Sequence, residues 1–154
     1  MEEVSQFSFP TDIRSGEGAR SALADFAGTR EVHRPLLVTD SGLVTTSAFR
    51  LVVDEMEQVW SDASAQFTGA SPNPTDLDVD GAWAAYAANG CDRIIGLGGG
   101  SALDAGTALR LKAAFPDVAL SAMLWGPRTH AATHSYSWWR PPSNDRALMW
   151  KRSG

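Results

Sequence analysis

Residues 96–104 read Gly-Leu-Gly-Gly-Gly-Ser-Ala-Leu-Asp and connect an apolar run at 93–97 to a helical pattern at 101–115. Consecutive glycines can adopt backbone angles that are closed to other residues, so their amides can approach a ligand closely. The first turn of the following helix adds unpaired N–H groups and a partial positive charge. This order of strand, glycine turn and helix favours a phosphate or pyrophosphate site at the carboxyl edge of a sheet.

The same stretch also allows a purely structural interpretation. Ser101 and Asp104 have the Ser-x-x-Asp spacing of a helix capping box, and glycines also form tight turns that bind nothing. The stretch does not open a first βαβ unit with G-x-G-x-x-G, and no Lys-Ser or Lys-Thr follows a G-x-x-x-x-G. Three glycines on the strand side of a capped helix nevertheless favour phosphate binding.

Strands and helices are expected to alternate around this turn. Short apolar runs predict strands at 35–39, 65–68 and 93–97, and a short extended segment at 7–9. Apolar residues at helical spacing predict helices at 17–27, around 49–59, between Thr75 and Asn89, and at 101–115. This alternation predicts an α/β fold with an open, mostly parallel sheet and flanking helices.

Three helix ends can be predicted from local residues. Thr75 and Asp78 have capping-box spacing at the start of the third helix, and Asn89-Gly90 should end it. Gly28 is the expected C-cap of the first helix.

Asp40 is a second candidate binding residue because it follows the apolar run 35–39 and so should lie at the carboxyl end of a strand. A carboxylate in this position can accept both hydroxyls of an adenosine ribose and would repel a 2′-phosphate. The alternative is a turn aspartate or helix cap, which is the more common role for such a residue.

Length and composition exclude several classes. The chain has 154 residues, 44% of them apolar, a net charge of −5 and a pI near 5.0. These values indicate a soluble globular chain that does not bind nucleic acid through its overall charge. The single cysteine, Cys91, cannot form an internal disulfide, which fits the cytoplasm. No run reaches the roughly 18 apolar residues of a membrane span, and the first residues lack the layout of a signal peptide.

The charge and the tryptophans divide the chain near residue 121. Residues 1–121 hold 8 Lys and Arg against 17 Asp and Glu, a net charge of −9. Residues 122–154 hold five against one, a net charge of +4, together with four of the six tryptophans. We therefore expect a domain at 1–121 and an atypical tail at 122–154, which is out-of-frame or disordered sequence.

Two other interpretations of the tail are weaker. His130 and His134 have the spacing of two ligands on one helix face, but no Glu lies between them and the neighbouring residues are poor helix formers. Basic residues interleaved with tryptophans can bind single-stranded nucleic acid by stacking, but no apolar period accompanies them.

Four motifs together resemble the N-terminal nucleotide-binding part of the iron-containing (group III) alcohol dehydrogenase family. The resemblance covers roughly residues 7–120 and is carried by Phe9-Pro10-Thr11-x-Ile13, the segment 34–43, Pro72-Asn73-Pro74-Thr75 and the segment 90–106. It implies a Rossmann-like, dehydroquinate-synthase-like domain that binds NAD(P), followed in intact members by a helical domain that holds Fe²⁺ or Zn²⁺.

The resemblance also implies roles for individual residues. The glycine turn would wrap the pyrophosphate, Asp40 would bind the adenosine ribose and favour NAD over NADP, and two more residues would lie beside the cofactor. The implied cofactor-binding residues are Asp40, Asn73, Gly98, Gly99, Gly100, Ser101 and Asp104. Thr107 stands where the family usually has Lys, which puts normal cofactor affinity in question.

The family's metal ligands belong to the helical domain, which this sequence does not contain, so no catalytic or metal-binding residue is assigned. We expect a truncated member of an NAD-linked alcohol or aldehyde oxidoreductase that is inactive alone. A glycerol dehydrogenase or maleylacetate reductase relative, a non-catalytic nucleotide-binding module and a non-functional product remain open. A dinucleotide partner is expected, with no nucleic acid and no membrane, and a homo-oligomer is compatible with the sequence.

Overall fold

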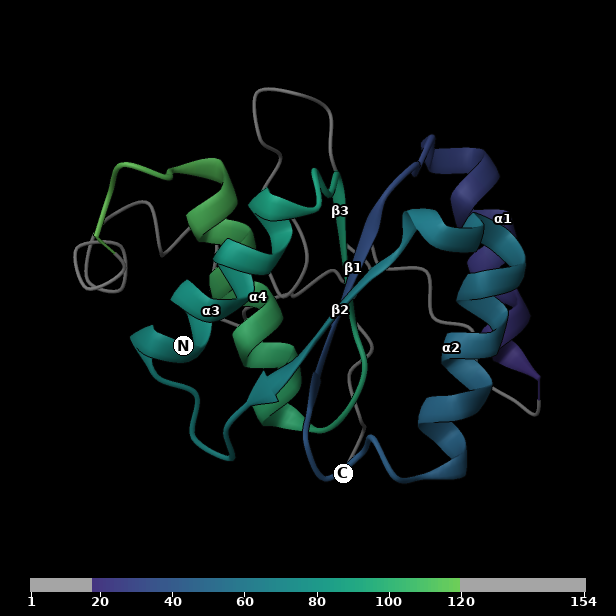
Figure 1. The fold of residues 1–154 in the computed structure, drawn as a ribbon, viewed down its shortest axis with the longest axis horizontal. Coiled ribbons are helices and arrows are strands. Elements are labelled where there is room, and N and C mark those ends of the chain that lie inside the picture. Colours follow the sequence, from purple (N-terminus) through teal and green to yellow (C-terminus); the bar gives the residue numbers. More distant parts are fainter. Residues whose placement is uncertain (1–17, 120–154) are drawn as a thin grey trace, which may run out of the picture.

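The fold is a three-stranded parallel sheet between two pairs of helices, seen in a computed structural model that describes residues 18–119 (Figure 1). The strands are β1 (Pro35–Asp40), β2 (Ala65–Ala70) and β3 (Arg93–Gly96), in the order β2-β1-β3. Both pairings are parallel, with Leu36 beside Ala65 on one side and Ile94 on the other. The predicted α/β class is confirmed.

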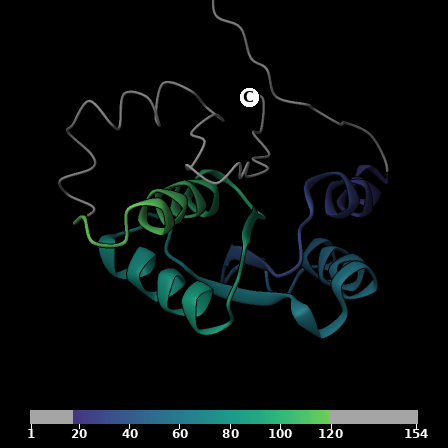
Figure 2. The same ribbon diagram turned by 90° about the horizontal axis from the view of Figure 1, so that it is seen from above.

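Helices cover both faces of the sheet (Figure 2). On one face lie α1 (Ala22–Arg30) and α2 (Ser47–Trp60), and on the other α3 (Asp76–Ala88) and α4 (Gly100–Ala114). Single 3₁₀ turns at Ala19–Ser21 and Ser61–Ala63 precede α1 and follow α2. Each strand is therefore followed by a helix, as the sequence predicts.

The path of the chain creates one position where the strand order reverses. After β1 the chain passes through α2 to β2, and it then returns through α3 to β3 on the far side of β1. The segments that leave β1 and β3 consequently turn toward opposite faces of the sheet. The carboxyl ends of these two strands, at the lower edge in Figure 1, form the topological switch point at which doubly wound folds bind ligands.

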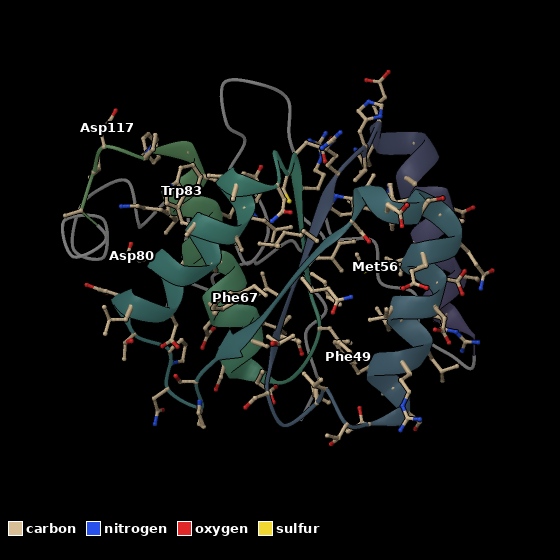
Figure 3. The ribbon with its side chains drawn as sticks, in the orientation of Figure 1. Phe49, Met56, Phe67, Asp80, Trp83 and Asp117 are labelled. Carbon is tan, nitrogen blue, oxygen red and sulfur yellow. The ribbon has the colours of Figure 1, made fainter. Side chains whose placement is uncertain are left out.

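The central strand holds the core together because it is buried on both faces. Leu36, Leu37 and Val38 have no exposed surface, which explains the continuous apolar run in place of an alternating one. Phe49 and Met56 pack from α2 on one face (Figure 3). The other face is filled mainly by residues of α3, α4 and β3: Ala82, Ile94, Ala105 and Leu109.

Several predicted boundaries differ from the structure by one or more residues, and two of them have a clear local cause. Gly28 does not end the first helix, because α1 continues to Arg30 and Glu31 takes the left-handed C-cap position at φ +52°. Its N–H donates to the carbonyl of Ala27, which keeps Gly28 inside the helix. Strand β2 continues to Ala70, two residues beyond the predicted run, because Ala70 pairs with Asp40 after a register shift.

The third helix follows the sequence prediction at both ends. The Thr75 hydroxyl and the Asp78 carboxylate form the predicted capping box, and Asn89 is the C-cap.

Cys91 lies just beyond this helix and is buried. Desolvation is the main reason that the pKa of its thiol is raised to about 11, and the charge of Asp92 adds to the effect.

Some expectations fall outside residues 18–119: the extended segment at 7–9, the tail at 122–154 and the pair His130 and His134. Within the described range, no helix is both long enough and apolar enough to cross a membrane.

Replacing Gly81 with alanine should destabilise the protein, although a change from glycine to alanine inside a helix is usually stabilising. A Cβ at Gly81 would lie 3.1 Å from the Phe67 ring, and the Cβ of an alanine at Gly69 would lie 3.0 Å from the same ring. The ring, labelled in Figure 3, is partly buried and would have to shift to accept a Cβ at either glycine. We expect Gly81→Ala to lower the free energy of unfolding by about 1 kcal/mol, because overpacking outweighs helix propensity.

Gly28→Ala is the matched control in α1, since its Cβ would meet nothing within 4 Å. This variant should raise the free energy of unfolding by about 0.5–1 kcal/mol. Urea denaturation of both variants measures the two signs, and equal stabilisation would contradict the packing of Phe67.

Candidate functional site

The glycine turn lies at the switch point, between β3 and α4. Strand β3 ends at Gly96, Gly99 is the N-cap, and α4 begins at Gly100. The backbone N–H of Leu97 donates to the carbonyl of Val38 at 2.9 Å, which fixes the start of the turn against β1. A Cβ at Gly99 or Gly100 would meet nothing within 4 Å, so this side of the turn is open.

Gly98 is the residue that brings the two loops of the switch point together. Its φ of +143° is a conformation that residues with side chains rarely adopt. A Cβ there would lie 2.9 Å from the Cβ of Ala102, 3.0 Å from Cδ1 of Leu43 and 3.2 Å from Oδ2 of Asp40. The backbone of the glycine turn therefore packs directly against the loop that follows β1, and a side chain would hold the two apart.

Asp40 has the turn role that the sequence allowed, and only one of its two carboxylate oxygens is used for it. Its Oδ1 atom accepts the backbone N–H groups of Gly42 at 2.9 Å and Leu43 at 3.1 Å, which is the arrangement of a turn aspartate. Its Oδ2 atom lies on the side of Gly98. One carboxylate oxygen builds the loop after β1, while the other faces the glycine turn.

Ser101 does not cap its own helix, so the capping-box interpretation of residues 101–104 was wrong. The helix begins one residue earlier, with Gly99 as N-cap, and no side chain caps it. The Ser101 hydroxyl instead donates to the carbonyl of Pro72, in the loop after β2. The reason is tertiary, because the loop after β2 reaches the first turn of α4 and offers a carbonyl there.

The bond between Ser101 and Pro72 holds the loop of Asn73 at the switch-point edge of the sheet. It is exposed and lies next to Pro72, in the segment between β2 and α3. Asp104 is also exposed, in the second turn of α4. The structure thus brings Asp40 and the turn 98–101 into direct proximity, ties the loop of Asn73 to them through Ser101, and leaves Asp104 on the adjoining helix.

Thr107 lies in α4 and is half-buried. Its hydroxyl donates to the carbonyl of Leu103 at 2.9 Å, one helical turn earlier. A threonine in this position hydrogen-bonds to its own helix, whereas a lysine would extend a positive charge away from it.

Thr39 belongs to the predicted strand 35–39 and was not among the predicted site residues. Its side chain is fully buried, and its hydroxyl has no hydrogen-bond partner in the described structure. A buried polar group without a partner is uncommon in folded proteins and needs a specific explanation. The available signal was a hydroxyl residue immediately before Asp40, at the end of a run that is otherwise aliphatic.

These features fit an anionic nucleotide. The turn supplies the exposed backbone of Gly99 and Gly100 and the N-terminal end of a 15-residue helix, and Gly98 lets this turn approach the loop after β1 closely. Among residues 18–119 there is no group of three or more His, Cys, Asp or Glu side chains that could hold a metal ion.

Comparisons with known proteins point to one family. The sequence profile described as "Iron-containing alcohol dehydrogenase" matches residues 10–134, which extends past the composition change at residue 121. The chain is 36% identical over 94 residues to 4-hydroxybutyrate dehydrogenase of Cupriavidus necator, covering 61% of this chain and 24% of that protein. It is 34% identical over 104 residues to lactaldehyde reductase of Escherichia coli (strain K12), covering 68% and 27%.

Solved structures agree with this relationship. Sulfoacetaldehyde reductase from Bifidobacterium kashiwanohense, in complex with NAD⁺, superposes with a TM-score of 0.67 at 27% identity, covering 79% of this chain and 31% of that one. A 1,3-propanediol oxidoreductase superposes with a TM-score of 0.60 at 31% identity, covering 64% and 25%. The chain spans about a quarter of the length of the curated relatives it matches. From its motifs, its fold and these matches, the chain belongs to the iron-containing alcohol dehydrogenase family.

Proposed function

We propose that this chain binds NAD at the switch point, as the nucleotide-binding part of a metal-dependent, NAD-linked alcohol or aldehyde oxidoreductase. The observation that carries the proposal is the contact at Gly98, where a glycine backbone with positive φ packs against the Asp40 carboxylate. A pyrophosphate and the adjoining ribose need an amide-rich turn and an acidic group side by side.

Each residue would contribute through a specific group. The backbone N–H groups of the 98–101 turn and the end of α4 would hold the pyrophosphate. Because the Ser101 hydroxyl is engaged with Pro72, we assign Ser101 a backbone contact with the cofactor and its side chain a structural one. Asn73, in the loop after β2, and Asp104, in α4, are both exposed and would lie beside the nucleotide. When bound, the nicotinamide supplies the hydride acceptor.

The preference for NAD over NADP rests on Asp40. Its Oδ2 atom faces the glycine turn, whereas Oδ1 is used by the backbone N–H groups of Gly42 and Leu43. A carboxylate oxygen can accept ribose hydroxyls but repels a 2′-phosphate. The complex of the sulfoacetaldehyde reductase with NAD⁺ supports NAD binding by analogy.

Asp40→Asn is the sharpest test of this preference. The variant keeps an oxygen for the N–H groups of Gly42 and Leu43, so the loop after β1 should stay folded, but it removes the negative charge. We expect NAD to bind about tenfold more weakly, the loss of one charge-assisted interaction. NADP should bind no more weakly than before. Calorimetric titration of both nucleotides measures the change.

Asp62→Asn is the control, because Asp62 is an exposed carboxylate in the 3₁₀ turn after α2. It should leave both affinities unchanged. If Asp40→Asn lowered the affinities for NAD and NADP equally, Asp40 would not distinguish the adenosine ribose of NAD from that of NADP. No NAD binding by the unaltered chain would overturn the proposed function itself.

Hydride transfer is proposed for the longer relatives and not for this chain alone. The purified chain, given NAD, a simple alcohol and Fe²⁺ or Zn²⁺, should bind the nucleotide without forming NADH. Absorbance of NADH in the same sample measures this, and steady turnover would contradict it. A cytoplasmic location and self-association remain parts of the proposal that rest on the sequence.

A further inference from the structure

The segment between β2 and α3 is unusually restricted for a loop. It reads Ser71-Pro72-Asn73-Pro74-Thr75, so that Asn73 stands between two prolines. Each proline fixes its own φ and also restricts the residue before it. We call this segment the 71–75 turn. Because its backbone is restricted locally, the position of Asn73 depends mainly on how the two ends of the turn are held.

One carboxylate holds both ends of the 71–75 turn. Oδ1 of Asp78 accepts the hydroxyl of Ser71 at 2.7 Å, and Oδ2 accepts the backbone N–H of Thr75 at 2.6 Å and its hydroxyl at 2.9 Å. The backbone N–H of Thr75 and then the Ser71 and Thr75 hydroxyls hold the pKa of Asp78 below its ordinary value. A helix cap alone would need only the contacts with Thr75, so the bond from Ser71 is an additional constraint.

The middle of the 71–75 turn is attached to the glycine turn. The carbonyl of Pro72 accepts the hydroxyl of Ser101, in the first turn of α4. Asp78 and Ser101 together therefore hold the turn at three points: its beginning, its middle and its end. Asn73 is the exposed residue at the centre of this arrangement, next to the accepting Pro72.

We propose that Asp78 is a positioning residue, which holds the 71–75 turn so that Asn73 is presented to the nucleotide at the switch point. This inference rests on the proposed function. Asp78 does not itself touch the cofactor, and its contribution is to preorganise the turn before binding, which lowers the ordering cost of the complex.

The test is a double-mutant cycle on NAD affinity, measured by calorimetry on the full chain. Asp78→Ala should raise the Kd for NAD about fivefold, and Asn73→Ala should raise it by a similar factor. In the Asn73→Ala background, Asp78→Ala should have almost no further effect. Independent, multiplying effects would overturn the proposal, because they would show that Asp78 does not act through Asn73.

Asp92→Ala is the matched control for loss of stability. The Asp92 carboxylate also accepts two backbone N–H groups, from His33 at 2.8 Å and Arg34 at 2.9 Å, but it lies at the amino end of β3, away from the switch point. This variant should be destabilised and should keep its NAD affinity. If Asp78→Ala and Asp92→Ala weakened NAD binding equally, Asp78 would have only a structural role.

Ser71→Ala is a milder variant that leaves the capping box of α3 intact. It should raise the Kd for NAD about twofold, and this increase should disappear in the Asn73→Ala background. If Asp78→Ala fails to fold, Ser71→Ala therefore tests the proposal in its place. An unchanged Kd for NAD in Ser71→Ala would then overturn the inference. Binding by the unaltered chain separates this result from failure of the proposed function.

Discussion

Gly98→Ala should abolish measurable NAD binding and lower the free energy of unfolding by about 2–4 kcal/mol. The added Cβ would lie 2.9 Å from Ala102, 3.0 Å from Leu43 and 3.2 Å from the Asp40 carboxylate. Strain at a φ of +143° and overpacking each cost at least about 1 kcal/mol, and together about 2–4 kcal/mol. Relief requires the loop after β1 to move away from the glycine turn, which separates the two halves of the proposed nucleotide site. Urea denaturation and calorimetric titration with NAD measure the two effects.

Gly90→Ala is the matched control, because Gly90 also has a positive φ, of +59°. A Cβ there would meet nothing within 4 Å, and the residue lies between α3 and β3, at the opposite edge from the glycine turn. It should cost about 1 kcal/mol of conformational strain and leave NAD affinity unchanged. If Gly98→Ala bound NAD as well as Gly90→Ala does, the proposed site at the switch point would be wrong.

Leu36→Ala should have the largest effect on stability, a loss of about 2–5 kcal/mol. Leu36 is fully buried in the central strand β1 and packs with residues of α3, α4 and β3. Removing its side chain leaves a cavity in a part of the core that is enclosed on every side and cannot easily collapse. The shift in the urea midpoint, with an unchanged m value, measures this loss.

Leu77→Ala makes the same chemical change on the surface of α3, where Leu77 is 81% exposed. It should change the free energy of unfolding by no more than about 0.5 kcal/mol. Similar effects of the two leucine variants would contradict the central position of β1.

The local elements of this fold could be predicted because their causes lie within a few residues. The apolar run 35–39 predicts a buried strand, and Thr75 with Asp78 predicts the start of α3. The order of strands and helices along the chain is then enough to predict an α/β sheet, and the glycine stretch predicts where an anion could bind. Boundaries were less accurate, as at Gly28, because a helix end depends on which carbonyls remain free for the following residues.

Contacts between loops could not be predicted in this way. Residue patterns are enough to predict the strands and helices, the mostly parallel sheet and the glycine turn as a candidate site. They do not reveal that Asp40 reaches Gly98, that Ser101 bonds to Pro72 or that Thr39 has a buried, unpaired hydroxyl. These contacts depend on the strand order β2-β1-β3, which places loops from distant parts of the chain at one edge. Local propensities favour each strand and helix, but the meeting of their ends follows from how the whole sheet packs.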